Sequence, residues 1–351
     1  MSKRHPYRIR NIFVRCNPIR LIRGDHYPQT LRELLETSSE RFGKRPFSKF
    51  IEGGQSYTYT SFKDTCDLQS QRLSRFGISA GDRVAILSQN MPNWTLAFFT
   101  ATAFGRVAIP ILPDSSTNEI TNILRHSETK VLYVSKRLLP KISEECLEKL
   151  TLVIDIEDFS FIKKDKEAFQ CDGWTKFPNA DSLATIIYTS GTTGNAKGVM
   201  LSHRNLCHNI MAAHKAQRCT PKDRFMSILP MAHTYEMALG CLYPIYVGAS
   251  VHYIQKPPTP SILLGAMKEV RPTVICVVPL IIEKVYRKSI VPTLQKSRTL
   301  RWMKKNIPWL LYYLVGRRLY RSFGGCLSFF GIGGSKLDPE VETFLKKAGF
   351  P

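Results

Sequence analysis

The sequence predicts an α/β protein with parallel β-sheets, and two observations support that prediction. Along the 351 residues, short apolar runs alternate with segments whose apolar residues recur at helical spacing. Strands separated by helices favour parallel sheets, because parallel neighbours must be joined by a crossover. The chain is also too long for a single minimal core and suits two packed subdomains.

The first elements of this pattern are a helix, a strand and a second helix. Thr30–Phe42 is predicted as an amphipathic helix because its leucines fall on one helical face. Tyr57–Thr60 is rich in strand formers, and Ser61–Phe76 returns to helical spacing. Four apolar strands are then expected, at Arg83–Leu87, Val107–Ile111, Lys130–Val134 and Thr151–Asp155.

A polar stretch over residues 163–181, with mixed charges, a glycine and a proline, predicts a boundary between two subdomains. The predicted organisation is a basic N-terminal arm at 1–28, a first α/β subdomain at 29–178 and a second at 179–351. Strands of the second subdomain are expected at Leu183–Tyr188, Phe225–Leu229, Thr273–Val278 and Leu327–Gly331.

The last predicted element is a helix with Asp338 as its N-cap and Pro339 at its first position. Gly349 provides a C-terminal stop. Its apolar residues form one stripe, Val341, Phe344, Leu345 and Ala348. We expect this stripe to need a further strand to cover it, so we interpret the chain as truncated.

Positive charge is concentrated in two segments. The chain has 50 Lys and Arg against 28 Asp and Glu, a net charge of +22. Residues 1–24 hold seven basic residues and residues 284–321 hold eleven, with no acid in either segment. A local positive field indicates an anionic partner, and no nucleic-acid-binding module is recognisable. The second segment also holds Trp302 and Trp309, so a helix at an anionic membrane interface and an ordinary solvated surface are its two interpretations.

Cysteine usage and hydropathy bear on the compartment. Nine cysteines are scattered from Cys16 to Cys326, with no Cys-x-x-Cys and no Cys/His pair at metal-ligand spacing. An odd, dispersed set suits a reducing compartment. The apolar runs fall short of the ~20 residues that span a bilayer. These features predict a cytoplasmic protein, with peripheral membrane association as the alternative that the basic segments allow.

One stretch has the composition of a phosphate-binding loop: Tyr188–Val199, which reads Y-T-S-G-T-T-G-N-A-K-G-V. Its glycines let backbone N–H groups approach an anion. Its Thr and Ser hydroxyls can donate to phosphate oxygens, and Lys197 adds a positive charge. A polyphosphate is the natural ligand, and a simple Gly/Thr-rich turn is the alternative.

This stretch differs from the two best-known phosphate-binding motifs. The P-loop requires Gly-Lys followed by Ser or Thr, whereas Lys197 stands between Ala196 and Gly198. The glycine spacing also differs from that of the Gly-x-Gly-x-x-Gly dinucleotide turn.

The stretch resembles the phosphate-binding signature of the adenylate-forming superfamily, which includes acyl-CoA synthetases, luciferases and peptide-synthetase adenylation domains. That family usually has proline where this chain has Ala196. Four further segments follow the family's order. Tyr57–Phe62 resembles its Tyr-Thr-Tyr segment, and Ala103–Pro113 resembles its strand-turn before a proline. Leu229–Glu236 resembles the Leu-Pro-x-x-His segment of long-chain fatty acyl-CoA synthetases, and Gly333–Pro339 resembles the Gly-Gly-x-x-Leu segment. The resemblance runs from about Leu31 to Pro351 and implies the large N-terminal domain of that family, made of stacked α/β subdomains.

The resemblance also implies a reaction and its participants. A fatty carboxylate attacks the α-phosphorus of ATP held with Mg2+, and coenzyme A then displaces AMP from the acyl-adenylate. It places His233 beside the acyl-adenylate carbonyl and a glycine-rich segment beside adenine and the acyl chain. The residues implied to bind nucleotide are Thr189, Ser190, Gly191, Thr192, Thr193, Gly194, Lys197, Gly333, Gly334 and Ser335.

Some landmarks of the family are not found in the 351 residues. They are the Tyr-Gly-x-Thr-Glu segment with its magnesium-binding glutamate, the ribose-binding aspartate and the C-terminal domain with its lysine. Three interpretations remain: an incomplete fatty acid–CoA ligase, an acyl-[acyl carrier protein] synthetase, and a truncated non-catalytic protein that binds nucleotide or membrane.

Overall fold

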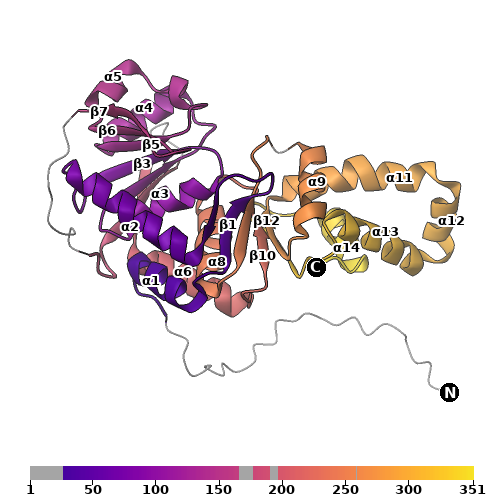
Figure 1. Cartoon of the computed structure of the whole chain (residues 1–351). Coiled ribbons are helices and arrows are strands. Elements are labelled where there is room, and N and C mark those ends of the chain that lie inside the picture. The colour runs from indigo at the N-terminus through magenta and orange to yellow at the C-terminus, as the bar shows by residue number, and fades with distance from the viewer. Residues whose placement is uncertain (1–26, 166–176, 190–196, 258) are drawn as a thin grey trace.

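The computed structural model describes residues 27–165, 177–189, 197–257 and 259–351. It confirms the predicted α/β class, with one sheet of six strands and one of seven (Figure 1). Most neighbouring strands in the described chain are parallel, and the antiparallel pairs β1–β2, β6–β7 and β8–β9 lie at sheet edges.

The seven-stranded sheet contains the predicted central strands. In sheet order its strands are β7 (Phe161–Lys164), β6 (Leu152–Asp155), β5 (Val131–Val134), β3 (Arg83–Leu87), β4 (Val107–Ile111), β8 (Leu183–Thr189) and β9 (Lys197–Ser202). Alternate residues of β3 belong to different cores: Val84 and Ile86 to one, Ala85 and Leu87 to the other. A sheet buried on both faces explains why its strands read as continuous apolar runs.

The six-stranded sheet joins distant parts of the chain. In sheet order its strands are β13 (Phe329–Ile332), β12 (Val274–Val277), β10 (Arg224–Met226), β11 (Ser250–Tyr253), β1 (Pro46–Phe50) and β2 (Ser56–Thr58). Strand β1 pairs in parallel with β11, about two hundred residues later, with Ser48 opposite Val251.

The predicted boundary between residues 178 and 179 therefore does not coincide with the division between the sheets. Strands β8 and β9 follow that boundary but belong to the seven-stranded sheet, and β1 and β2 precede it but belong to the six-stranded one. Sheet membership is decided by long-range backbone pairing, which local composition does not encode.

Helix α3 (Pro92–Thr102) joins the two sheets into one body. All of its residues are buried, and it contacts β1 of one sheet and β3 and β4 of the other. The Trp94 and Phe98 rings stack at 5.6 Å between centroids. The Asn93 amide accepts from the Tyr57 hydroxyl at 2.7 Å and donates to the Ile156 carbonyl at 2.7 Å, so it also links the sheets.

The N-terminal helices follow the prediction with shifted ends. Helix α1 is Leu31–Phe42, and α2 is Tyr59–Arg75. The strand expected over Tyr57–Thr60 stops at Thr58, because Thr58 and Ser61 form a capping box that starts α2. The other helices of the body are α4 (Thr117–His126), a 3-10 turn (Leu139–Lys141), α5 (Glu144–Lys149), α6 (His203–Ala216), α7 (Thr234–Glu236), a π-helical turn (Met237–Leu242), α8 (Tyr243–Val247) and α9 (Pro260–Val270).

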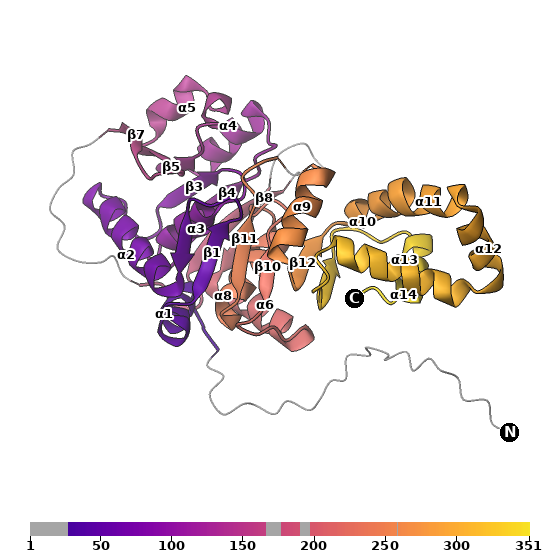
Figure 2. The same ribbon diagram turned by 45° about the vertical axis from the view of Figure 1, so that its right-hand side comes forward.

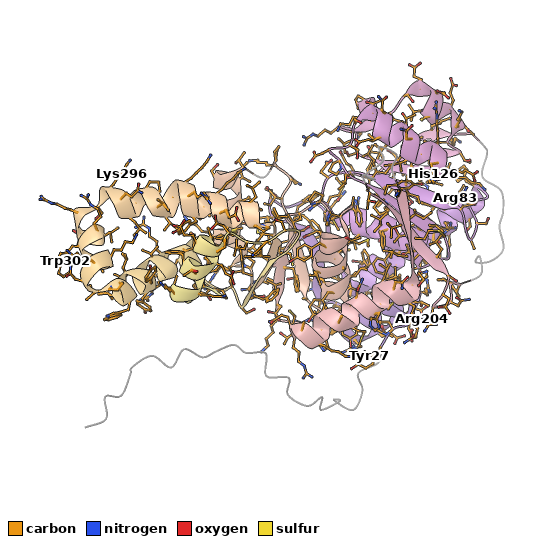
Figure 3. The ribbon with its side chains drawn as sticks, turned by 180° about the vertical axis from the view of Figure 1, so that it is seen from behind. Tyr27, Arg83, His126, Arg204, Lys296 and Trp302 are labelled. Atoms are coloured by element: carbon orange, nitrogen blue, oxygen red, sulfur yellow. The ribbon has the colours of Figure 1, made fainter. Side chains whose placement is uncertain are left out.

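Between β12 and β13 the chain leaves the body as a helical protrusion, defined here as residues 279–322 (Figure 2). Its elements are α10 (Pro279–Val285), a π-helical turn (Tyr286–Ile290), α11 (Val291–Lys296), α12 (Arg298–Asn306) and α13 (Pro308–Ser322). Lys296 and Trp302 lie at its far end (Figure 3).

The last helix, α14 (Pro339–Lys347), confirms the predicted cap, since the Asp338 side chain accepts from the Glu340 N–H at 2.8 Å. The expectation that its apolar stripe needs a further strand is wrong. Helices of the protrusion cover it: the Phe344 ring lies 5.0 Å from Tyr286 and 5.8 Å from Tyr312. A Cβ at Gly316 of α13 would lie 2.2 Å from the Ala348 carbonyl oxygen, so the helices meet backbone to backbone.

Candidate functional site

The candidate site lies where strand ends of the two sheets converge. Strands β10, β12 and β13 run parallel, so the residues that follow them, from Ser227 and from Gly333, lie at one edge of the six-stranded sheet. In the other sheet β3, β4 and β8 are parallel, which places Asn90 just beyond the carboxyl end of β3 and Thr189 at the carboxyl end of β8. Open α/β sheets bind ligands at such edges.

Asn90 connects the two edges through its side-chain amide. Its Nδ2 donates to Ser227 Oγ at 2.9 Å and to the Leu229 carbonyl at 2.6 Å, and its Oδ1 accepts from the Met231 N–H at 3.0 Å. These bonds explain why β10 ends at Met226 and not at Leu229 as predicted. The segment after Met226 leaves the sheet to bond with a residue of the other sheet's edge.

Glu236 supports the same segment from inside. It is 1% exposed, and Ser227 Oγ donates to its Oε1 at 2.7 Å. Burial raises the pKa of the Glu236 carboxyl to about 8, against the lowering effect of that hydrogen bond. A Cβ at Gly240 would lie 2.4 Å from Oε1, so glycine at 240 leaves room for the acid.

His233 stands exposed at the end of this supported segment, as the N-cap of α7. Its Nδ1 accepts from the Tyr235 N–H at 3.2 Å. Because Nδ1 accepts, the neutral ring carries its proton on Nε2 and can donate from there to an oxygen of a ligand. His203, by contrast, is buried and accepts from the Leu31 N–H at 3.1 Å, so its contacts are structural.

The Gly-Gly segment contacts the His233 segment through Tyr235. A Cβ at Gly333 would lie 2.8 Å from Cζ of Tyr235, and one at Gly331 would lie 3.0 Å from its hydroxyl oxygen. Gly334 has a φ of +91°, a conformation that favours glycine. Ser335 follows in an exposed position. Because Gly331 and Gly333 have no side chain, the backbone can approach the Tyr235 ring closely.

Two antiparallel strands, β8 and β9, flank the predicted phosphate loop. Strands β8 and β9 pair so that Thr189 lies opposite Lys197, and both are exposed. Tyr188 is held by a 2.7 Å hydrogen bond to His126. The remaining predicted loop residues, Ser190, Gly191, Thr192, Thr193 and Gly194, lie outside the described residues.

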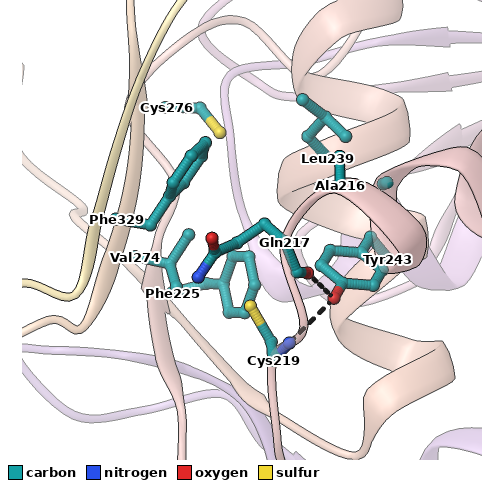
Figure 4. Close-up of a pocket in the computed structure, with 10 residues that line it drawn as sticks. Ala216, Gln217, Cys219, Phe225, Leu239, Tyr243, Val274, Cys276 and Phe329 are labelled. Atoms are coloured by element: carbon teal, nitrogen blue, oxygen red, sulfur yellow. Dashed lines mark hydrogen bonds between the residues drawn. The ribbon is translucent and has the colours of Figure 1, made fainter. Parts of the chain in front are cut away.

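A pocket of about 90 Å³ lies between the end of α6, the π-helical turn and strands β10, β12 and β13 (Figure 4). Its wall is mostly apolar, with Phe225, Leu239 and Phe329 among its residues. The Tyr243 hydroxyl closes one side, since it accepts from the Cys219 N–H at 2.9 Å and donates to the Gln217 carbonyl. Cys276 belongs to both regions, because it lines the pocket and also interacts with Tyr235.

The sequence predicted three groups of site residues, the phosphate loop, the His233 segment and the Gly333 segment, and the structure brings the last two together. The His233 and Gly333 segments meet at Tyr235, whereas in the described chain no hydrogen bond or ion pair joins the side chains of Thr189 or Lys197 to either segment. Sequence reasoning missed the supporting residues Asn90, Tyr235 and Glu236. The last two stand within the quoted Leu229–Glu236 motif, where a charged residue among apolar neighbours was the available signal.

The sequence profile of the AMP-binding enzyme family matches residues 35–351. The chain belongs to this family. The resemblance drawn from the phosphate-loop, Leu-Pro-x-x-His and Gly-Gly motifs is thereby confirmed.

Relatives of this AMP-binding chain include fatty acyl-CoA synthetases. It is 26% identical to fatty acyl-CoA synthetase A of Dictyostelium discoideum, with 83% of this chain and 48% of that protein covered. It is 28% identical to the long-chain-fatty-acid–CoA ligase ACSBG2 of Rattus norvegicus, with 93% and 56% covered. The chain thus spans about half the length of the curated relatives that it matches.

Solved structures of AMP-binding enzymes share the fold. O-succinylbenzoate coenzyme A synthetase of Bacillus subtilis, in complex with AMP, superposes with a TM-score of 0.68 at 18% identity, covering 91% of this chain and 71% of that one. ATP-bound MatB of Rhodopseudomonas palustris gives 0.67 at 21% identity, with 89% and 57% covered. The fold is therefore that of adenylate-forming enzymes.

Family resemblance also implies Mg2+. Within the described ranges, no three His, Cys, Asp or Glu side chains gather as a metal site. Mg2+ is commonly held by one or two carboxylates together with substrate phosphates. The described residues therefore offer the ion no cluster of this kind.

Proposed function

We propose that the protein is an AMP-forming acid–thiol ligase, which converts a long-chain fatty acid to an acyl-adenylate and then to an acyl-CoA thioester. Family membership supports the reaction class. The structural observation that carries the proposal is the meeting of the His233 and Gly333 segments at Tyr235, beyond the carboxyl ends of parallel strands.

The reaction assigns a task to each group. A fatty carboxylate oxygen attacks the α-phosphorus of ATP and pyrophosphate leaves; the coenzyme A thiol then attacks the acyl carbon and AMP leaves. Donors fixed in advance stabilise charge that builds on phosphate oxygens. We assign Thr189, Lys197 and the loop between them to the β- and γ-phosphates. Mg2+, when bound, supplies further positive charge there.

His233 is assigned to the acyl end of the adenylate. The Asn90 amide and the Glu236 acid hold the backbone before and after it, so its ring is placed by groups that do not themselves reach the ligand. The Nε2 proton of His233 is then available to an oxygen of the bound carboxylate. We assign Gly333, Gly334 and Ser335 to the adenine side of the site.

The apolar pocket supports a hydrocarbon substrate. Its walls offer an acyl chain apolar contacts with few polar groups to desolvate. Its volume of about 90 Å³ is below the ~300–1,000 Å³ of sites that enclose drug-sized ligands, so it holds only a part of a long chain. Coenzyme A is proposed over acyl carrier protein as the acceptor because the matching relatives are named as acyl-CoA synthetases and CoA ligases.

The proposal is tested by titrating the chain with palmitoyl-sulfamoyl-adenosine, a non-reactive acyl-adenylate analogue, in a calorimeter. We expect saturable binding that weakens by about tenfold or more in His233→Ala, because a hydrogen bond to a polar ligand group is lost. His208→Ala is the matched control, an exposed histidine on α6 that should leave binding unchanged. Binding that is absent, or equal in wild type and His233→Ala, would contradict the proposal.

A further inference from the structure

The charge of the protrusion is almost entirely positive, since Glu283 is its one acid. Its residues 284–321 include eleven basic side chains and no acid. Every one of the eleven is exposed: Lys284, Arg287, Lys288, Lys296, Arg298, Arg301, Lys304, Lys305, Arg317, Arg318 and Arg321.

These basic side chains are also almost entirely without acidic partners. Among the described residues, Arg287 is the only one of the eleven within ion-pair distance of an acid, Asp338. Nearby acids of α14 are engaged elsewhere, since Glu340 accepts from the Tyr286 hydroxyl and Glu342 pairs with Lys346. Ten charges are therefore left for an anionic partner outside this chain.

Large apolar side chains stand exposed among these charges. Trp302 is 59% exposed, Trp309 54%, Tyr313 52% and Leu314 45%. On α12, Arg298, Trp302 and Lys305 follow helical spacing along one side, opposite the buried Met303. On α13, Trp309 and Tyr313 are one turn apart. Isolated exposed apolar residues are ordinary, but a group of them within a basic surface indicates an interaction site.

We propose that α12 and α13 form a docking surface for an anionic lipid surface, with the exposed aromatic rings inserted among the headgroups. Helices rich in Lys and Arg with Trp on their exposed face lie at such interfaces, where amphipathic rings are favoured. Five of the eleven basic residues are lysines, which are depleted in the cores of protein–protein interfaces. No described helix is long and apolar enough to cross a membrane.

This docking goes beyond the ligase reaction, and it does not depend on it. A chain that binds lipid but not the adenylate analogue would contradict only the proposed function. A chain that binds the analogue but not lipid would contradict only this proposal.

The test is co-sedimentation of the full chain with phosphatidylcholine vesicles, with and without phosphatidylglycerol. To remove the other basic segment from the measurement, all proteins carry Gln in place of the seven basic residues of 1–24. We expect binding only to the anionic vesicles, loss of binding at high salt, and a blue shift of tryptophan emission. Replacing Arg298, Arg301, Lys304 and Lys305 with Gln should weaken binding at least about tenfold.

Two further variants distinguish a lipid surface from an acidic protein as the partner. Trp302→Ala, which changes no charge, should weaken vesicle binding several-fold and reduce the emission shift. The charge-matched control replaces four exposed basic residues of the body with Gln and should bind like the parent: Lys44, Arg75, Arg137 and Lys222. Equal loss in this control, or binding to polyglutamate as tight as to anionic vesicles and unaffected by Trp302→Ala, would overturn the proposal. The polyglutamate result would indicate an acidic protein as the partner.

Discussion

The body and the protrusion of this molecule use the same residue types in opposite ways. In the body, several basic side chains pair with acids, as in Arg32–Asp67 and Lys130–Asp82, and the tryptophan Trp94 is fully buried. In the protrusion, ten of eleven basic residues lack such partners and Trp302 is 59% exposed. The difference teaches that charge and aromatic rings are balanced within the chain at the centre of the body, whereas the protrusion gathers unpaired positive charge and an exposed Trp302 on one surface.

The largest expected effect on stability comes from replacing a tryptophan with alanine, once in the body and once, in a separate variant, in the protrusion. Trp94→Ala should lower the free energy of unfolding by about 3–5 kcal/mol, because it opens a cavity in α3 between the sheets. Trp302→Ala should change it by less than about 0.5 kcal/mol, because the ring has little to contact. Urea unfolding followed by circular dichroism measures both. Similar losses in the two variants would remove the contrast between body and protrusion.

A smaller effect, which depends on pH, is expected at Glu236. Its pKa is raised from 4.5 to about 8 by burial, so the folded protein holds a proton there that the unfolded chain releases. The stabilising contribution is therefore complete below about pH 4.5 and is lost as the pH rises through 8. The slope between these values is at most about 1.4 kcal/mol per pH unit.

Glu236→Gln cannot ionise and keeps an acceptor for the Ser227 hydroxyl. We expect its stability relative to wild type to rise from about pH 5 to about pH 9, measured by urea unfolding across that range. Glu269→Gln, at an exposed position, is the control and should show no such change. A constant difference between Glu236→Gln and wild type would mean that the body tolerates an ionised carboxylate at this position.

The smallest effect is expected where the protrusion meets α14. Arg287→Ala removes the ion pair with Asp338, at a site where Arg287 is 62% exposed, and should cause only a small loss of stability because solvent screens the pair. Lys304→Ala removes a charge without an acidic partner and should leave stability unchanged. Unfolding at low and high salt distinguishes them, since only the first difference should shrink with salt. A large loss for Lys304→Ala would show that the protrusion's charges have partners within the chain.

For the candidate site, the sequence pointed to His233 and Gly333 but not to the residues that hold their segments. His233 and Gly333 stand in short motifs whose composition is unusual, so local patterns are enough to find them. Asn90 lies more than a hundred residues before the segment that it supports, and nothing in its own neighbourhood indicates a partner at Leu229. Long-range hydrogen bonds of this kind depend on which strand ends meet.

Strand predictions show the same limit. The strands Arg83–Leu87 and Val107–Ile111 are located correctly. A strand buried on both faces is apolar at almost every position, so it stands out in the sequence as a continuous apolar run. Strand β1 is missed, since Pro46–Phe50 is short and mixes Pro, Ser and Lys with its aromatics. The start of strand β9 lies within the predicted phosphate loop, and the exposed Val199 and Met200 explain the lack of alternation in this strand.

The sequence by itself determined the α/β class, the phosphate-loop composition and the excess of positive charge between residues 284 and 321, because each depends on residues close together in the chain. The tertiary structure decided three further features. It placed β1 beside β11, it covered α14 with helices of the protrusion in place of a strand, and it joined the two strand edges through Asn90. Each of these three contacts joins residues that are far apart in the sequence. Such contacts are selected by the packing of the whole chain and not by local propensity.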